Sequence, residues 1–208
     1  MPSATEAARG YTTSPLSRAV TVTVQQAVTA ALTSSATSYA YGGRPVLTVR
    51  LAPTTAPGTV TFYDGSTSLG RATLSAGTAK LTAPVLGVGT HRLTARYAGG
   101  GLFAASTSAV RTLTVGKRAA AVSLKASSTS VRTTTTVALT ATVAPSSATG
   151  TVTFRDGTRS LGTAKVSSGR AVLKVRLPRR GTRSVTAAYG GSSTVKPATS
   201  KVLSVRVR

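Results

Sequence analysis

The sequence contains no cysteine, one histidine (His91) and three acidic residues, Glu6, Asp64 and Asp156. The absence of cysteine excludes a disulfide framework and a thiolate metal site. Three scattered carboxylates cannot converge into a calcium site, and a lone histidine lacks the partners of a catalytic triad or a zinc site. The composition therefore predicts that the protein is not an enzyme and binds no metal or cofactor.

Long apolar runs are also missing. No stretch approaches the 18 or more apolar residues of a membrane-spanning helix, so we expect no membrane insertion. The first ten residues show no basic segment followed by an apolar one, and the chain carries no sorting motif, so neither a signal peptide nor an anchor is predicted. There is no useful helical stripe, whereas Thr and Val are abundant and favour strands.

What the chain does contain is an internal repeat. Shifted by 92 residues, 30–115 aligns with 122–207 without a gap, and 34 of the 86 aligned positions are identical. We therefore predict two copies of one domain, at 27–116 and 117–208. The linkers, 25–29 and 116–120, are too short to be flexible tethers, which predicts copies joined end to end.

Within each copy, strand-like segments alternate with turn signals. In the first copy the strands are expected near 30–37, 45–52, 58–63, 69–75, 78–84, 90–98 and 107–115. About seven short strands at this spacing are typical of an antiparallel β-sandwich. The predicted fold class is therefore all-β, with two tandem sandwiches.

The alternation of apolar and polar residues also predicts which side chains point inward. In the first copy they are Leu32, Leu47, Val49, Leu51, Val60, Phe62, Leu69, Leu74, Ala79, Leu81, Leu93, Ala95, Tyr97, Leu113 and Val115. In the second copy they are Leu124, Leu139, Ala141, Val143, Val152, Phe154, Leu161, Val166, Ala171, Leu173, Val185, Ala187, Tyr189, Val205 and Val207.

One hairpin pattern occurs in both copies, at 58–70 and 150–162. Asp64-Gly65 and Asp156-Gly157 are predicted to be structural turns, because Asp can bond its own backbone and Gly accepts positive φ. Gly70 is expected to allow a bend or a bulge just behind Leu69. The two aspartates occupy the same turn in separate copies, so they do not form an acid–base pair.

The repeated strings carry a family resemblance. GTVTFYDGSTSLGRATLSAGTAKLT with GTHRLTARYAGGGLFAASTSA, and GTVTFRDGTRSLGTAKVSSGRAVLKV with GTRSVTAAYGGSSTVKPATS, resemble the bacterial Ig-like repeats of large surface and secreted proteins, notably of actinobacteria. The resemblance covers about 27–208. It implies an Ig-like sandwich, an extracellular or cell-surface setting and a role as a stalk or adhesion module, and it transfers no catalytic residue.

The first 26 residues resemble the end of a further copy. Residues 10–24 match 102–115 with a one-residue slip, which predicts the partial C-terminal strand of a preceding truncated repeat. A mis-set start codon or a gene fragment would explain this. The alternative hypothesis is that Val20, Val22 and Val24 form an orphan strand that adds to the sheet edge of another molecule.

The charge is strong and uneven. Lys and Arg total 26, the formal net charge is +23, and 18 of the basic residues lie in 101–208. In the strands of the second copy, basic residues occupy the outward positions that alternate with the inward ones. This alternation predicts a basic face that binds polyanions. Its expected members are Lys165, Arg170, Lys174, Arg176, Arg179, Arg180 and Arg183. A biased composition on a solvated surface would give the same charge, and both interpretations stay open.

Two functions follow from the sequence. The first is a non-enzymatic spacer or adhesion segment of a cell-surface or secreted bacterial protein, with neighbouring Ig-like repeats as partners. The alternative is a module that binds an anionic cell-wall polymer, an acidic polysaccharide or nucleic acid. No specific nucleic-acid recognition is expected, because a recognition helix and an aromatic platform are missing. A carbohydrate-binding accessory would need a row of exposed aromatics, for which only Tyr39, Tyr41 and Tyr63 qualify.

Overall fold

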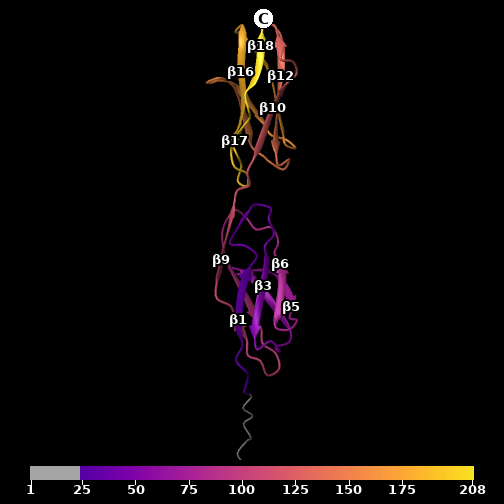
Figure 1. Ribbon diagram of the computed structural model, residues 1–208, viewed down its shortest axis with the longest axis vertical. Coiled ribbons are helices and arrows are strands. Elements are labelled where there is room, and N and C mark those ends of the chain that lie inside the picture. Colours follow the sequence, from indigo (N-terminus) through magenta and orange to yellow (C-terminus); the bar gives the residue numbers. More distant parts are fainter. Residues whose placement is uncertain (1–23) are drawn as a thin grey trace, which may run out of the picture.

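A computed structural model describes residues 24–208 of the chain. The predicted partial repeat at 1–26, with Val20 and Val22 of the hypothetical orphan strand, lies almost wholly outside the described residues. Every regular element within 24–208 is a β-strand. Figure 1 shows the two copies following one another along the long axis of the molecule, with the C-terminus at the far end.

The first domain is a sandwich of two sheets. One sheet has the order β1 (Thr29–Ser34), β3 (Val46–Ala52), β6 (Thr78–Thr82). The other has the order β2 (Ser38–Ala40), β9 (Arg111–Gly116), β7 (Gly89–Tyr97), β4 (Thr59–Asp64), β5 (Thr67–Thr73), with β8 (Ser106–Thr107) also paired to β7. Apart from β2 and β9, which run parallel, the paired strands are antiparallel.

The second domain repeats this arrangement. Its three-stranded sheet has the order β10 (Ala121–Ala126), β12 (Thr136–Ala144), β15 (Arg170–Arg176). Its larger sheet has the order β11 (Ser130–Val131), β18 (Leu203–Val207), β16 (Gly181–Tyr189), β13 (Thr151–Asp156), β14 (Arg159–Lys165), with β17 (Ala198–Thr199) paired to β16. The predicted pair of tandem antiparallel sandwiches is confirmed.

The first predicted strand of each copy is in fact two strands in different sheets. The expected strand 30–37 becomes β1, which pairs with β3, and β2, which pairs in parallel with β9. The break follows Ser35, whose side-chain oxygen accepts a hydrogen bond from the Val46 backbone N–H at 3.0 Å. With the end of β1 held there, the chain crosses to the opposite sheet.

The core of each domain contains all of the predicted inward side chains, fully or partly buried. Phe62 and Phe154 are both completely buried. Buried positions that alternation did not predict lie in loops, at strand ends or in the short crossing strands. They are Val28, Ala56, Ala83, Leu86, Val131, Val137, Ala148, Leu177 and Val195. Their burial is set by the closure of the sandwich ends, which a strand pattern does not encode.

The predicted bulge in the repeated hairpin is present in both copies. Phe62 pairs with Gly70 while Tyr63 pairs with Ser68, so Leu69 is the extra residue. Gly70 has φ +139°, and a Cβ there would meet the Leu81 side chain at 3.3 Å. The bulge therefore needs glycine for its backbone conformation and for the close packing of the second sheet.

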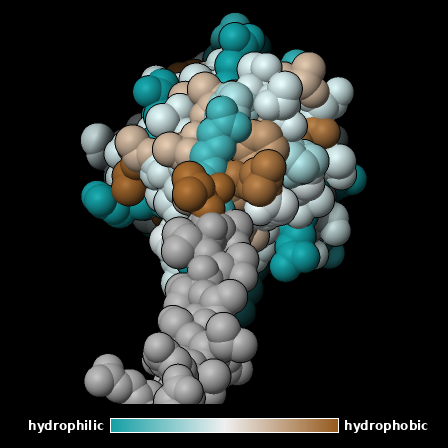
Figure 2. Space-filling model, turned by 90° about the horizontal axis from the view of Figure 1, so that it is seen from below, coloured by the Kyte–Doolittle hydropathy of each residue, from teal (hydrophilic) through white to brown (hydrophobic). Residues whose placement is uncertain are grey.

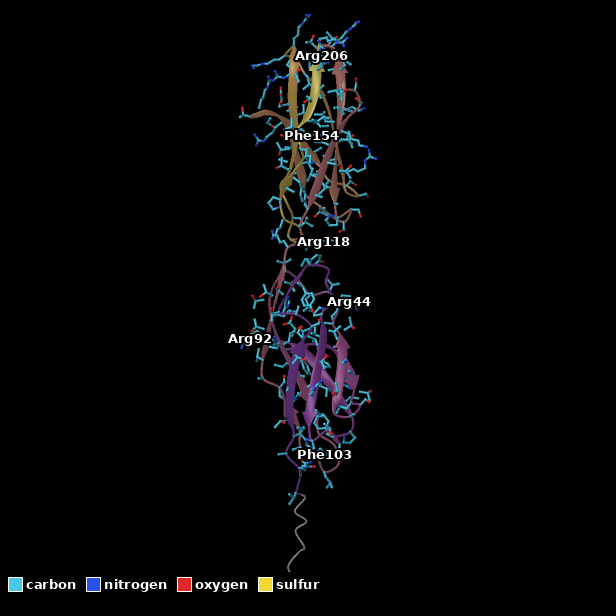
Figure 3. All side chains as sticks on the ribbon, viewed as in Figure 1. Arg44, Arg92, Phe103, Arg118, Phe154 and Arg206 are labelled. Carbon is cyan, nitrogen blue, oxygen red and sulfur yellow. The ribbon has the colours of Figure 1, made fainter. Side chains whose placement is uncertain are left out.

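The start of each domain is fixed by the same pair of backbone hydrogen bonds. In the second domain, Arg118 N–H donates to the Thr194 carbonyl at 2.9 Å, and Lys196 N–H donates to the Arg118 carbonyl at 2.8 Å. In the first domain, Gln26 makes the equivalent bonds with Leu102 and Ala104. Arg118 lies at the junction of the two domains in Figure 3. The linker is thus bound to the domain that it enters.

Candidate functional site

The first candidate group surrounds the Asp64 carboxylate. Asp64 Oδ2 lies 2.6 Å from His91 Nδ1, and Asp64 Oδ1 accepts a hydrogen bond from the Arg92 backbone N–H at 3.2 Å. The carboxylate therefore links the hairpin to β7 and does not bond its own turn, which differs from the expected Asx-turn. The reason is that β7 runs beside β4 and brings these donors within reach of Asp64.

The same contacts shift the titration of His91. Its Nε2 lies 2.9 Å from the Gly87 carbonyl oxygen, so both ring nitrogens face acceptors and only the doubly protonated ring satisfies both. Burial by itself lowers the pKa of His91. The hydrogen bonds to Asp64 and Gly87 and the negative charge of Asp64 outweigh burial, so the pKa of His91 lies above its ordinary value of 6.5.

In the second domain an arginine takes the place of this histidine. Arg183 Nε donates to Asp156 Oδ2 at 2.7 Å, and Arg183 Nη2 donates to the same oxygen. Only about a quarter of the Arg183 side chain is exposed. Sequence reasoning placed Arg183 in the polyanion-binding set and gave Asp156 no partner. The structure instead pairs these two residues, so the Arg183 guanidinium is already occupied by a carboxylate.

Gly65 and Gly157 lie in the predicted turns. Both have φ +57°, and each is the first of the two loop residues between paired strands. Glycine with positive φ at this position is the pattern of a type II′ hairpin turn, which matches the twist of the flanking strands. Asp64 and Asp156 are the last residues of β4 and β13, one position before the turn. These four residues hold the hairpin against the neighbouring strand.

Three of the predicted basic residues form one surface. Arg170, Lys174 and Arg176 are exposed on β15, alternating with buried or half-buried residues. Lys125 of β10 joins them, because Lys125 lies opposite Thr140 and Arg170 lies opposite Thr142 on the central strand β12. We call Lys125, Arg170, Lys174 and Arg176 the basic face. A shallow groove of about 400 Å³ crosses it, lined by Ser123, Lys125, Ala126, Ser127, Ala138, Thr140, Thr142 and Arg170.

The other predicted basic residues lie elsewhere. Lys165 is exposed on β14, which belongs to the opposite sheet, so it does not extend the basic face. Arg179 and Arg180 are exposed in the loop between β15 and β16. Sequence parity identified outward side chains correctly along each strand but could not tell to which sheet a strand belongs.

The three tyrosines considered for carbohydrate binding do not form a row. Tyr39 and Tyr41 are half-buried against the core of the first domain, and the Tyr39 hydroxyl hydrogen-bonds with Ser35. Tyr63 lies on the outer face of β4 and lines a groove with Arg96, a residue that sequence reasoning did not single out. The signal that could have identified Arg96 is its replacement by Ala188 in the second copy.

In residues 24–208 no group of three or more His, Cys, Asp or Glu side chains is arranged to hold a metal ion. The part of the chain that the structure describes contains no helix of the length and apolarity needed to span a membrane.

Two sandwiches of this strand order, each with a parallel short strand beside its last strand, have the topology of immunoglobulin-like domains. The sequence profile described as "Bacterial Ig-like domain (group 3)" matches twice, at 32–116 and 124–208. The chain belongs to this family. The predicted family resemblance is therefore confirmed, and the tandem Ig-like domains form a structural module. No curated protein matches the chain.

Solved structures with similar folds come from varied sources. The fibronectin(III)-like modules of Clostridium thermocellum CbhA are 19% identical to this chain, with a TM-score of 0.36. The match covers 85% of this chain and 92% of that chain. The Yersinia pseudotuberculosis adhesin InvE is 17% identical, with a TM-score of 0.40 and coverages of 86% and 58%. Titin domains Z1Z2, solved with telethonin, are 20% identical, with a TM-score of 0.44 and coverages of 89% and 99%.

Proposed function

We propose that the chain is a spacer in the stalk of a cell-surface or secreted bacterial protein, and that it acts by holding successive Ig-like domains end to end. The observation that carries this proposal is the paired hydrogen bonding of each incoming linker, at Gln26 and at Arg118. A linker bonded to the domain that follows has little freedom to bend, which suits a stalk and an adhesion module carried on one. The extracellular setting usual for this family agrees with such a role.

The N-terminal end of the first domain supports neighbouring repeats as partners. Leu102, which is 66% exposed, and the half-buried Phe103 lie beside Gln26. Figure 2 looks along the molecule at this end and shows hydrophobic atoms gathered there. In the second domain the equivalent of Phe103 is Val195, which is buried in the core of that domain. A preceding domain seated on Leu102 and Phe103 would cover apolar surface that is otherwise exposed to water.

The test is to remove one linker hydrogen bond. Arg118→Pro deletes the N–H that donates to Thr194, and we expect a broader distribution of distances between the two domains. Because the chain has no cysteine, spin labels on cysteines introduced at Thr67 and Arg159 report this distance without background. Gln26→Pro removes the equivalent bond outside the junction and should leave the distribution unchanged. A broad distribution already in the wild-type chain would contradict the spacer proposal.

A second candidate function is the binding of an anionic cell-wall polymer to the basic face. Each of its members is exposed, and within residues 24–208 the two aspartates are engaged with His91 and Arg183, so no carboxylate pairs with the basic face. Hydroxyl side chains such as Thr140 and Thr142 line the groove between Lys125 and Arg170. Cations flanking hydroxyl donors suit the phosphates of a linear polymer.

Matched double variants test this second function. Arg170→Ala with Lys174→Ala removes two charges from the basic face, whereas Arg50→Ala with Lys80→Ala removes two from the same sheet of the first domain. We expect binding of poly(glycerol phosphate) to weaken as the salt concentration rises. The slope of log affinity against log salt concentration should fall by up to about two for the Arg170→Ala, Lys174→Ala variant only. Equal losses for both pairs would indicate binding by net charge alone, and no binding at low salt would exclude the function.

A further inference from the structure

The outer face of the larger sheet in the first domain contains a groove of about 370 Å³, within the range of about 300–1,000 Å³ of small-molecule sites. It is lined by Tyr63, Gly65, Ser66, Thr94, Arg96 and Thr107. Tyr63 comes from β4, Thr94 and Arg96 from β7, and Thr107 from β8, so three strands and one turn contribute. None of these residues belongs to the basic face, which lies on the second domain.

The pairing of the strands brings these side chains to one surface. Tyr63 lies directly opposite Thr94, and Arg96 lies directly opposite Thr107. Tyr63 and Arg96 are therefore diagonal neighbours across β4 and β7, within reach of each other's long side chains. Thr94 lies opposite Tyr63 and two residues from Arg96 on β7, and its side chain lines the same groove. The groove is thus lined by one aromatic ring, one guanidinium and the hydroxyl groups of Ser66, Thr94 and Thr107.

The charge of Arg96 is available to a ligand. Arg96 is exposed, and among the described residues neither aspartate pairs with it, because Asp64 bonds His91 and Asp156 bonds Arg183. A guanidinium binds a carboxylate through two parallel hydrogen bonds. A neighbouring tyrosine ring offers an apolar surface with a polar edge, and serine and threonine hydroxyls both donate and accept.

We infer that this groove binds an acidic sugar unit of a polysaccharide, with the sugar ring against Tyr63, its carboxylate on Arg96 and its hydroxyls on Ser66, Thr94 and Thr107. A uronic acid has all three features. A single aromatic ring and a single guanidinium do not make the repeated stacking platform and phosphate track of a nucleic-acid site. This inference goes beyond the proposed spacer function and does not depend on it.

The second domain provides an internal comparison. At the positions equivalent to Tyr63 and Arg96 it has Arg155 and Ala188, while Thr186 and Thr199 are retained. The fold therefore tolerates loss of both the ring and the guanidinium. It follows that these two side chains are not required for the sandwich, and that the combination of Tyr63 with Arg96 is found in the first domain and not in the second.

The experiment titrates the full chain with a tetramer of α-1,4-linked galacturonate, followed by amide NMR and calorimetry. We expect shifts of the Thr94, Arg96 and Thr107 amides. Tyr63→Ala and Arg96→Ala should each weaken binding about tenfold or more, as expected for a charged hydrogen bond or a stacked ring. Arg155→Ala removes one charge from the equivalent face of the second domain and should change the affinity less than twofold.

Each other outcome would overturn the inference. If the neutral galactose tetramer bound equally well, the carboxylate would not be recognised by Arg96. If an oligodeoxythymidine bound more tightly and shifted the same amides, the ligand of the groove would be nucleic acid and not an acidic sugar. Shifts confined to the second domain, or equal losses for Arg96→Ala and Arg155→Ala, would show that net charge and not this groove binds the tetramer.

Discussion

At the scale of single residues, the two copies hold the repeated hairpin to the neighbouring strand with different side chains. Asp64 and Asp156 each fasten the repeated hairpin to the neighbouring strand, but the cation is His91 in one copy and Arg183 in the other. The aspartates could be identified from the sequence because their turn recurs. Their partners, 27 residues further along the chain, could not be identified, because only the pairing of β4 with β7 and of β13 with β16 brings them together.

This difference predicts a pH dependence confined to the first domain. Because the pKa of His91 is raised on folding, the Asp64–His91 pair stabilises the domain fully below pH 6.5, and this stabilisation is lost as the pH rises through the folded pKa. The loss should be up to about 1 kcal/mol, as for partly exposed ion pairs. Denaturation of the wild-type chain and of His91→Arg at several pH values measures it.

His91→Arg supplies the control, because it installs the residue that the second domain already uses. Its guanidinium stays charged over the whole range, so the fall in stability between pH 6 and 8 should disappear. An unchanged fall in the variant would mean that another group is responsible.

At the scale of elements, the hairpins differ in how well their turn residues suit their backbone. The turn between Ser75 and Thr78 has two residues with positive φ, Ala76 at +45° and Gly77 at +69°. This is the pattern of a type I′ turn, in which asparagine followed by glycine is preferred. A Cβ at Gly77 would lie 2.6 Å from Thr54 Cα, so only glycine fits there. Ala76 is exposed, so a residue that suits the left-handed backbone better can take its place.

We predict that Ala76→Asn stabilises the first domain by about 0.5–1 kcal/mol, since alanine is disfavoured in the left-handed region and asparagine tolerates it. Ser168→Asn, at the equivalent position with φ +46°, should do the same for the second domain. Gly77→Ala should destabilise the protein. Thermal unfolding of the three variants tests these signs, and a lower midpoint for Ala76→Asn would contradict the turn assignment.

At the scale of the whole molecule, the two hydrophobic cores are separate. The cluster around Phe62 and the cluster around Phe154 share no residue. The link between the domains consists of the short segment from Gly116 to Ala121 and its hydrogen bonds to the loop at 192–196. Folding of one domain is therefore expected to depend little on the other.

Truncating one core tests this independence. Phe62→Ala should cost about 3–5 kcal/mol, a large part of the stability of a domain of this size, and should do so in the first domain alone. Hydrogen exchange of the amides of β4 and β7 should accelerate, while that of β13 and β16 stays unchanged. Phe154→Ala should give the mirror result. Joint loss of protection in both domains would show that the junction couples their folding.

The sequence by itself determined the repeat, most of the strands, the inward side chains and the family. The first three depend on local alternation or on the comparison of one copy with the other, and the family depends on the resemblance of the repeated strings to known Ig-like repeats. Tertiary structure alone decided the division of 30–37 between two sheets, the partners of the aspartates, the separation of Lys165 from the basic face and the placing of Tyr63 and Arg96 in one groove. The physical reason is that parity along a strand fixes in or out, whereas sheet membership and neighbours across strands are fixed by how the whole sandwich closes.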